Sequence, residues 1–151
     1  MSFTIRKATL EDLPDIMEEL KNFDKFYDSK KKLYRDDETT SAVIGGLIEN
    51  HVFFVAENNR TERVVGFISG LFCPHMYNPD IMTLVETFWW VNPEYRNTRA
   101  GLQLLNAYVD YGKENADWII CTIEADSPVN EKSFYKRGFK LKERSFLMEV
   151  H

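Results

Sequence analysis

Hydrophobic and polar positions repeat with two different periods along the chain, which predicts both strands and helices. Residues 3–7 alternate between apolar and polar and predict an opening strand. A helical period follows over about residues 10–23, with Pro14 in the first turns, where its missing N–H is tolerated. A capping aspartate and an apolar side predict a second helix over about residues 36–49.

Short apolar runs and a second helical period extend the pattern to the end of the chain. They predict strands at 51–57, 64–72, 81–91, 118–123, 139–143 and 146–150, a long helix after a loop at 92–100, and a short helix at 130–136. This order predicts an α/β fold with one mixed sheet covered by helices. Within it, the two strands of the strand–helix–strand unit 81–123 are expected to be parallel and joined by a right-handed crossover. No repeat or linker interrupts the 151 residues, so we expect a single domain over residues 1–151.

The composition narrows the function. Hydrophobic residues make up 44% and charged residues 28%, which is typical of a soluble globular protein. The net charge is −5, so the basic surface of a nucleic-acid-binding protein is missing, whereas an amine would be attracted. No apolar stretch is long enough to span a bilayer, and the first residues do not resemble a signal peptide. We therefore expect a cytoplasmic protein without nucleic-acid or membrane partners.

The cysteines and histidines do not indicate a metal site. Cys73 and Cys121 each lie in an apolar run and are expected to be reduced core thiols. The three histidines have no ligand spacing, so we expect no metal.

The segment 89–102 predicts an anion site. A strand runs into a short loop, and an amphipathic helix follows at once. The first N–H groups of a helix have no partner within it, and the helix dipole adds positive charge there, so a phosphate fits well. Arg96 and Arg99 add cations, and Gly101 permits close approach of the backbone to a ligand. The alternative is a structural turn with two solvated arginines.

The same segment resembles the GNAT family of N-acetyltransferases. Residues 91–96 match the family's Val-x-Pro-x-Tyr-Arg, and residues 96–101 match its Arg/Gln-x-x-Gly-x-Gly/Ala in all but one place. Arg99 stands where the family usually has the first glycine, where it could hinder the backbone's wrap around a pyrophosphate or supply a cation instead. Residues 135–139 resemble the late Tyr-x-x-x-Gly-Phe but are one residue short.

This resemblance implies the acyl-CoA N-acyltransferase fold, a mostly antiparallel central sheet with one splayed parallel strand pair, flanked by helices. It also implies acetyl-CoA as co-substrate, with the backbone of Trp89 and Val91 along the pantetheine arm. The amides of residues 97–102 would then hold the pyrophosphate. The implied cofactor-binding residues are Trp89, Val91, Arg96, Asn97, Thr98, Arg99, Ala100, Gly101, Leu102 and Asn130.

Glu86 is the candidate general base. It is the only charged residue of the predicted strand 81–91, and burial there would raise its pKa towards the working range of a base. Family members commonly use an acidic residue on this strand to deprotonate the amine. A structural carboxylate paired with a neighbouring cation is the alternative.

Tyr135 is the candidate general acid, because the family often protonates the departing thiolate from a tyrosine on the last helix. The shortened motif leaves the register open, and counting back from Gly138 places Phe134 at the usual position. Core packing on a short helix is the alternative for both side chains. For Asn130 the alternative to a cofactor contact is a helix cap.

Together these features predict an acetyl-CoA-dependent N-acetyltransferase (EC 2.3.1 type), in which a primary amine attacks the thioester directly in a ternary complex. The acceptor is a small molecule or a peptide, and the loops 24–35 and 73–80 are expected to shape its pocket. A homodimer is one expectation, because many relatives are dimers. The alternative function is an inactive GNAT-like module that binds CoA and serves regulation or a partner.

Overall fold

The computed structural model describes residues 1–27 and 29–151, which form two compact units, Met1–Cys121 and Thr122–His151. Residue 28, within the predicted loop 24–35, lies outside the described residues. The first unit contains strands β1 (Phe3–Lys7), β2 (Val52–Asn58), β3 (Val64–Pro74), β4 (Met82–Val91) and β5 (Trp118–Ile120), with helices α1 (Leu13–Phe26), α2 (Asp37–Asn50) and α3 (Ala100–Asn115). Two 3₁₀ helices, η1 (Leu10–Asp12) and η2 (Pro93–Tyr95), precede α1 and α3.

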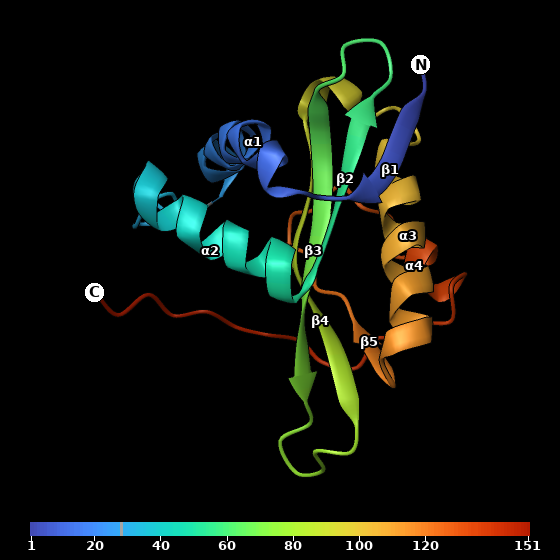
Figure 1. Ribbon diagram of the computed structural model, residues 1–151. Helices are drawn as coiled ribbons and strands as arrows, with labels where there is room; N and C mark the ends of the chain where they lie inside the picture. Colours follow the sequence, from blue (N-terminus) through green and yellow to red (C-terminus); the bar gives the residue numbers. More distant parts are fainter. Residues whose placement is uncertain (28) are drawn as a thin grey trace. The chain divides into compact units, whose positions relative to one another are not determined.

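The five strands form one mixed sheet in the order β1-β2-β3-β4-β5. The first three pairings are antiparallel, and β4 and β5 are parallel, as expected for strands joined by α3. The fold class expected from the sequence is therefore confirmed. Helices α1 and α2 cover one face of the sheet and α3 covers the other (Figure 1).

Each face of the sheet has its own apolar layer. Ile16 and Leu20 of α1 pack with Ile44 and Leu47 of α2 against Phe67 of β3. On the other side, the face of α3 that meets the sheet is fully or almost fully buried; it comprises Leu104, Leu105, Tyr108, Val109 and Gly112. The helical period in the sequence therefore marks most of the buried faces, whereas the apolar Val43 of α2 and Leu102 of α3 are exposed.

The ends of the helices follow local chemistry. Asp36 caps α2, since its Oδ1 accepts a 2.6 Å hydrogen bond from the Thr39 N–H. Pro14 lies in the first turn of α1, as predicted. The helix continues to Phe26 rather than ending near residue 23, so part of the predicted loop 24–35 is helical.

The second unit differs from the sequence prediction. Its one helix, α4 (Lys132–Tyr135), is shorter than the predicted 130–136. Residues 122–151, all of which the structure describes, contain no strand, so the strands predicted at 139–143 and 146–150 are absent and β5 stops at Ile120. Alternation alone does not make a strand, because a strand also needs a partner for its backbone hydrogen bonds.

Candidate functional site

The parallel pair β4–β5 forms a fork. Pairing covers only Thr83↔Trp118 to Val85↔Ile120, whereas β4 continues to Val91. Just beyond the last pair, β4 carries a bulge. Ser69 pairs with Phe88 and Gly70 with Glu86, which leaves Thr87 as the additional residue. A bulge bends its strand and increases the local twist, so it helps β4 to diverge from β5 at this point.

Glu86 lies between the last β4–β5 pair and the bulge, and its side chain is half-buried. Its negative charge contributes to the pKa of two neighbouring groups, Cys121 and Tyr108. Burial raises the pKa of the Cys121 thiol, and the Glu86 charge raises it further. Burial also raises the pKa of Tyr108, with smaller contributions from Cys121 and Glu86. Burial and the charge of the candidate base therefore both favour the neutral forms of the Cys121 thiol and the Tyr108 hydroxyl.

Tyr108 of α3 ties the two strands together where they separate. Its side chain is fully buried, and its hydroxyl lies 3.4 Å from both the Leu84 carbonyl of β4 and the Ile120 carbonyl of β5. Gly70 of β3 makes room for this ring, since a Cβ there would lie 2.8 Å from Tyr108 Cε2. A side chain of α3 thus reaches both strands beside the point where their pairing ends.

The turn from β4 into α3 carries the predicted anion site. Asn92 caps η2, since its Oδ1 accepts a 3.0 Å hydrogen bond from the Glu94 N–H. Within the predicted amide cluster, Thr98 donates to the Tyr95 carbonyl at 3.2 Å and Ala100 to Thr98 Oγ1 at 3.3 Å. The described part of the chain provides no acceptor for the N–H groups of the other four members, Asn97, Arg99, Gly101 and Leu102.

These amides fit an anionic group. No acidic side chain lies in the first turn of α3, so the positive end of the helix dipole is not neutralised there. A Cβ on Gly101 would meet only Val91 Cγ2, at 3.6 Å, so the protein's own packing does not require glycine at this position. Unbonded N–H groups, a helix N-terminus and an open backbone suit a pyrophosphate.

Two arginines flank the turn in different ways. The Arg96 side chain packs back onto the sheet, where Nε donates to the Val91 carbonyl at 3.0 Å. Its guanidinium carbon lies 4.8 Å from the centroid of the Trp90 ring and 5.5 Å from that of Phe26. Arg99 immediately precedes α3 and is exposed to solvent. Trp89 is half-buried and Val91 is buried.

The remaining predicted residues lie in the second unit. Phe134 is buried and packs edge-on against Phe139, with ring centroids 5.5 Å apart. Tyr135 is exposed, and its hydroxyl donates a 3.3 Å hydrogen bond to the Glu131 carboxylate. Asn130 Oδ1 accepts from the Lys132 N–H at 2.9 Å, an Asx-type turn at the start of α4, whose N-cap residue is Glu131. The register of α4 therefore buries phenylalanine and exposes tyrosine.

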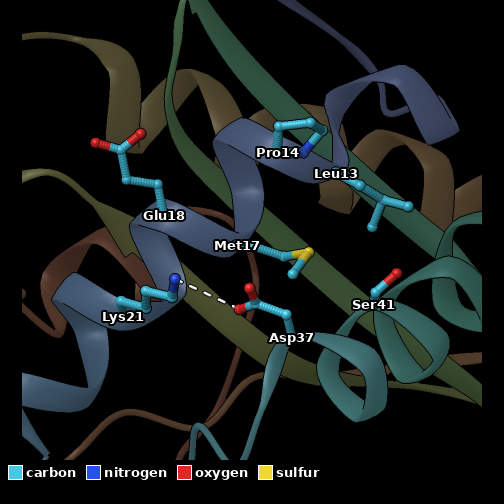
Figure 2. Close-up of a pocket in the computed structure, with 7 residues that line it drawn as sticks. All are labelled: Leu13, Pro14, Met17, Glu18, Lys21, Asp37 and Ser41. Atoms are coloured by element: carbon cyan, nitrogen blue, oxygen red, sulfur yellow. Dashed lines mark ion pairs between the residues drawn. The ribbon is translucent and has the colours of Figure 1, made fainter.

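A separate cavity of about 570 Å³ lies between α1 and α2 (Figure 2). It is lined by Leu13, Pro14, Met17, Glu18, Lys21, Asp37 and Ser41, none of which is a predicted site residue. Its charged groups are already paired. Lys21 lies 3.4 Å from Asp37, as the dashed line in Figure 2 marks, and Glu18 accepts from Arg63 at 2.8 Å. This cavity therefore lacks a poised catalytic group.

The described residues also lack two other kinds of site. No three or more His, Cys, Asp or Glu side chains are grouped so that they could hold a metal ion. No described helix combines the length and the apolar character that crossing a membrane requires.

Sequence reasoning missed Thr87 and Tyr108 as parts of the fork. It also missed Glu19 of α1, whose carboxylate accepts hydrogen bonds from the Trp90 and Asn92 side chains at the end of β4. The bulge at Thr87 and the contacts of the Tyr108 hydroxyl with two strands depend on distant partners, so neither can be recognised from the neighbouring sequence. Glu19 had a weak local signal, since it is a charged residue beside the apolar stripe of α1.

The fold and the β4–α3 turn place this protein among the acetyltransferases. Residues 13–139 match the acetyltransferase (GNAT) family, and because this match covers most of the chain, the chain belongs to that family. The family resemblance of the sequence is thereby confirmed.

A curated relative is an uncharacterised N-acetyltransferase of Methanocaldococcus jannaschii, 30% identical over 156 residues. The alignment covers 94% of this chain and 62% of the relative, so the chain spans less than two thirds of the relative's length.

Solved structures share the fold at low identity. Glucosamine-6-phosphate N-acetyltransferase of Arabidopsis thaliana aligns with a TM-score of 0.75 at 16% identity, over 100% of both chains. A predicted acetyltransferase of Clostridium acetobutylicum, solved with acetyl-CoA, aligns with a TM-score of 0.73 at 17% identity, over 99% of this chain and 97% of that one.

Proposed function

We propose that this protein transfers an acetyl group from acetyl-CoA to a primary amine, with both substrates bound in one ternary complex. The observation that carries the proposal is the β4–α3 turn, where four backbone N–H groups without acceptors lie at a helix N-terminus beside two arginines. The forked strand pair supports it further, since the β4 edge beyond Val85 continues without β5 and can pair with an extended ligand arm. The family match includes parts of both units, which supports one acetyltransferase domain over residues 1–151.

The proposed chemistry begins with Glu86 at the fork. Bound acetyl-CoA supplies the thioester. Glu86 takes a proton from the amine, directly or through water, as the C–N bond forms and the C–S bond breaks. N–H groups near Val91 stabilise the charge that develops on the carbonyl oxygen. Tyr135 gives a proton to the departing thiolate, the role that the family resemblance assigns to it. The acceptor amine is a small molecule or a peptide.

The alternative is a GNAT-like module that binds CoA without catalysis. The register of α4 favours it, because the buried residue is Phe134, which cannot donate a proton, and the Tyr135 hydroxyl is bonded to Glu131.

Thermal melting with and without acetyl-CoA tests the cofactor site. Acetyl-CoA at 100 times its Kd stabilises the folded state by about 2.7 kcal/mol, which at this size raises the Tm by roughly 5–10 °C. We expect this shift to shrink in Arg99→Ala, which removes a cation beside the amides. Arg60→Ala is the control, because Arg60 is an exposed arginine in a different turn. An absent shift at millimolar acetyl-CoA would refute both candidate functions.

Amine-dependent release of the CoA thiol then separates the two candidates. An active enzyme releases thiol only when an acceptor amine is present, and Glu86→Gln is expected to lower kcat by about 10²–10⁴-fold while acetyl-CoA still raises the Tm. A full Tm shift with no thiol release across a panel of small amines, polyamines and peptides would favour the non-catalytic module.

A further inference from the structure

A buried carboxylate on α1 reaches the end of β4. Glu19 is 8% exposed, and its two oxygens accept hydrogen bonds from two residues of the site strand and turn. Oε2 accepts from Trp90 Nε1 at 2.7 Å, and Oε1 accepts from Asn92 Nδ2 at 2.9 Å. A carboxylate is costly to bury unless such donors satisfy it, and hydrogen bonds to a charged group are among the stronger ones.

This contact orients the start of the turn. The Asn92 amide has a defined orientation, since Nδ2 points to Glu19 and Oδ1 accepts the N–H of Glu94, the contact that caps η2. The Trp90 ring, fixed by the other oxygen of Glu19, is the surface on which Arg96 stacks. One side chain of α1 therefore holds Trp90 and Asn92, the residues on either side of Val91 where β4 leads into the turn.

We propose that Glu19 is the positioning residue of the acetyl-CoA pyrophosphate turn. It presets the amides before the cofactor arrives and couples α1 to the cofactor side of the site. The proposal rests on the proposed function. The chemical reason for a carboxylate at this place is that two donors, an indole N–H and an amide NH₂, need two acceptors from one side chain.

Glu19→Gln tests this with almost no change in shape. A glutamine offers one acceptor and one donor. The indole N–H of Trp90 cannot reverse, so the new amide oxygen stays with Trp90 and its NH₂ group faces the NH₂ group of Asn92. Asn92 must then either lose this contact or rotate its amide and lose the cap on Glu94. Either way the turn loses one hydrogen bond.

The double variant Glu19→Gln/Asn92→Asp restores the network with its polarity reversed. One oxygen of the new aspartate accepts from the glutamine NH₂, and the other accepts from the Glu94 N–H. The net charge of the pair is unchanged. Glu18→Gln is the matched control, because it makes the same chemical change one residue away on the exposed side of α1, where Glu18 pairs with Arg63.

The readouts are the Kd of acetyl-CoA by calorimetry at 25 °C, and KM and kcat if the protein turns over. We expect Glu19→Gln to raise the Kd of acetyl-CoA about tenfold, because the variant must first bring the turn into the conformation that binds the cofactor. The kcat at saturating acetyl-CoA should stay within about twofold of the wild type. The double variant should return Kd to within about threefold of the wild type, and Glu18→Gln should not change it.

An unchanged Kd in Glu19→Gln, or a double variant no better than the single one, would overturn the proposal. If Glu19→Gln does not fold at 25 °C, Asn92→Ala removes the Glu19–Asn92 hydrogen bond together with the cap on Glu94, and it should raise Kd by at least as much. A wild-type protein that fails to bind acetyl-CoA would overturn the proposed function together with this inference, whereas binding that is indifferent to Glu19 overturns this inference alone.

Discussion

At the scale of single residues, the backbone of Arg99 explains why an arginine can stand where the GNAT motif usually has a glycine. Its φ of −80° and ψ of −6° lie in the right-handed helical region, which any residue adopts. The side chain is exposed, so it meets no packing constraint. The departure from the motif thus carries no backbone strain, and it adds a cation beside the unbonded amides.

Gly101, unlike Arg99, keeps the glycine of the motif. We predict the effect of Gly101→Ala on stability and on cofactor binding. In the free protein a Cβ meets only ordinary contact, so alanine should leave stability unchanged or raise it by up to about 1 kcal/mol. With acetyl-CoA, the methyl group would lie where the pyrophosphate approaches, and the Tm shift caused by acetyl-CoA should fall by at least half. Gly46→Ala in α2, where a Cβ meets nothing within 4 Å, is the control that should keep the full shift. An undiminished shift in Gly101→Ala would show that the cofactor does not approach this amide.

At the scale of elements, α1 is held at its entry by an ion pair. Two nitrogens of Arg6 in β1 donate to the two oxygens of Asp12, each at 2.8 Å, and Arg6 also reaches Glu57 of β2 at 3.1 Å. Asp12 further accepts the Thr9 N–H at 2.8 Å. This cluster fixes the start of the helix whose later turn carries Glu19.

Asp12→Asn should therefore destabilise the fold by about 1–3 kcal/mol at pH 7, measured by urea unfolding. The hydrogen bond from Arg6 is the largest reason that the pKa of Asp12 is lowered, with burial opposing it. Because the pKa of Asp12 is lower in the folded than in the unfolded state, its carboxylate contributes stability at pH values above its ordinary pKa of about 4. This contribution is lost as the pH falls through the pKa of the folded state. The difference between wild type and variant should accordingly shrink below about pH 4. Glu11→Gln, an exposed neighbour in η1, should change little, and a pH-independent difference for Asp12→Asn would contradict the assignment.

At the scale of the whole molecule, the chain has two units of very different structure. Met1–Cys121 contains the sheet and three long helices, whereas Thr122–His151 contains only the short α4. Large apolar side chains near the end of the second unit are exposed, with Phe146 at 93% and Met148 at 82%. Exposed backbone outside regular structure is where proteases cut most readily.

Limited digestion with chymotrypsin should thus cleave first within residues 139–151, followed by mass spectrometry of the products. Tyr77 is the internal comparison, since it is 85% exposed but lies in a loop closed by the His75 N–H donating to the Ile81 carbonyl at 2.8 Å. We expect the C-terminal cut to precede the cut at Tyr77. The reverse order would mean that the last residues are protected in solution.

Local patterns in the sequence were sufficient for the fold class and for the strand-turn-helix at β4–α3, whose anion-binding role remains a prediction. The 3.6-residue period of α3 marks most of the buried face, and residues 91–101 carry the motif that resembles the family, to which the match over residues 13–139 assigns the chain. Such features depend on neighbours within a few positions, so they can be recognised without knowing the rest of the chain. The role of Glu86 remains a prediction that Glu86→Gln tests, and the role of Tyr135 remains a prediction from the family resemblance.

The tertiary structure decided the features that depend on distant partners. The alternation at 139–150 looked like two strands, but neither forms, because a strand exists only when another strand accepts its hydrogen bonds. The bulge at Thr87 follows from the register between β3 and β4, and the fork follows from the early end of β5. The role of Glu19 depends on its hydrogen bonds with Trp90 and Asn92, which lie more than seventy positions away in the sequence. The sequence thus specifies most of the buried faces and the local turn that precedes α3, whereas the shape of the site arises only when separate segments meet.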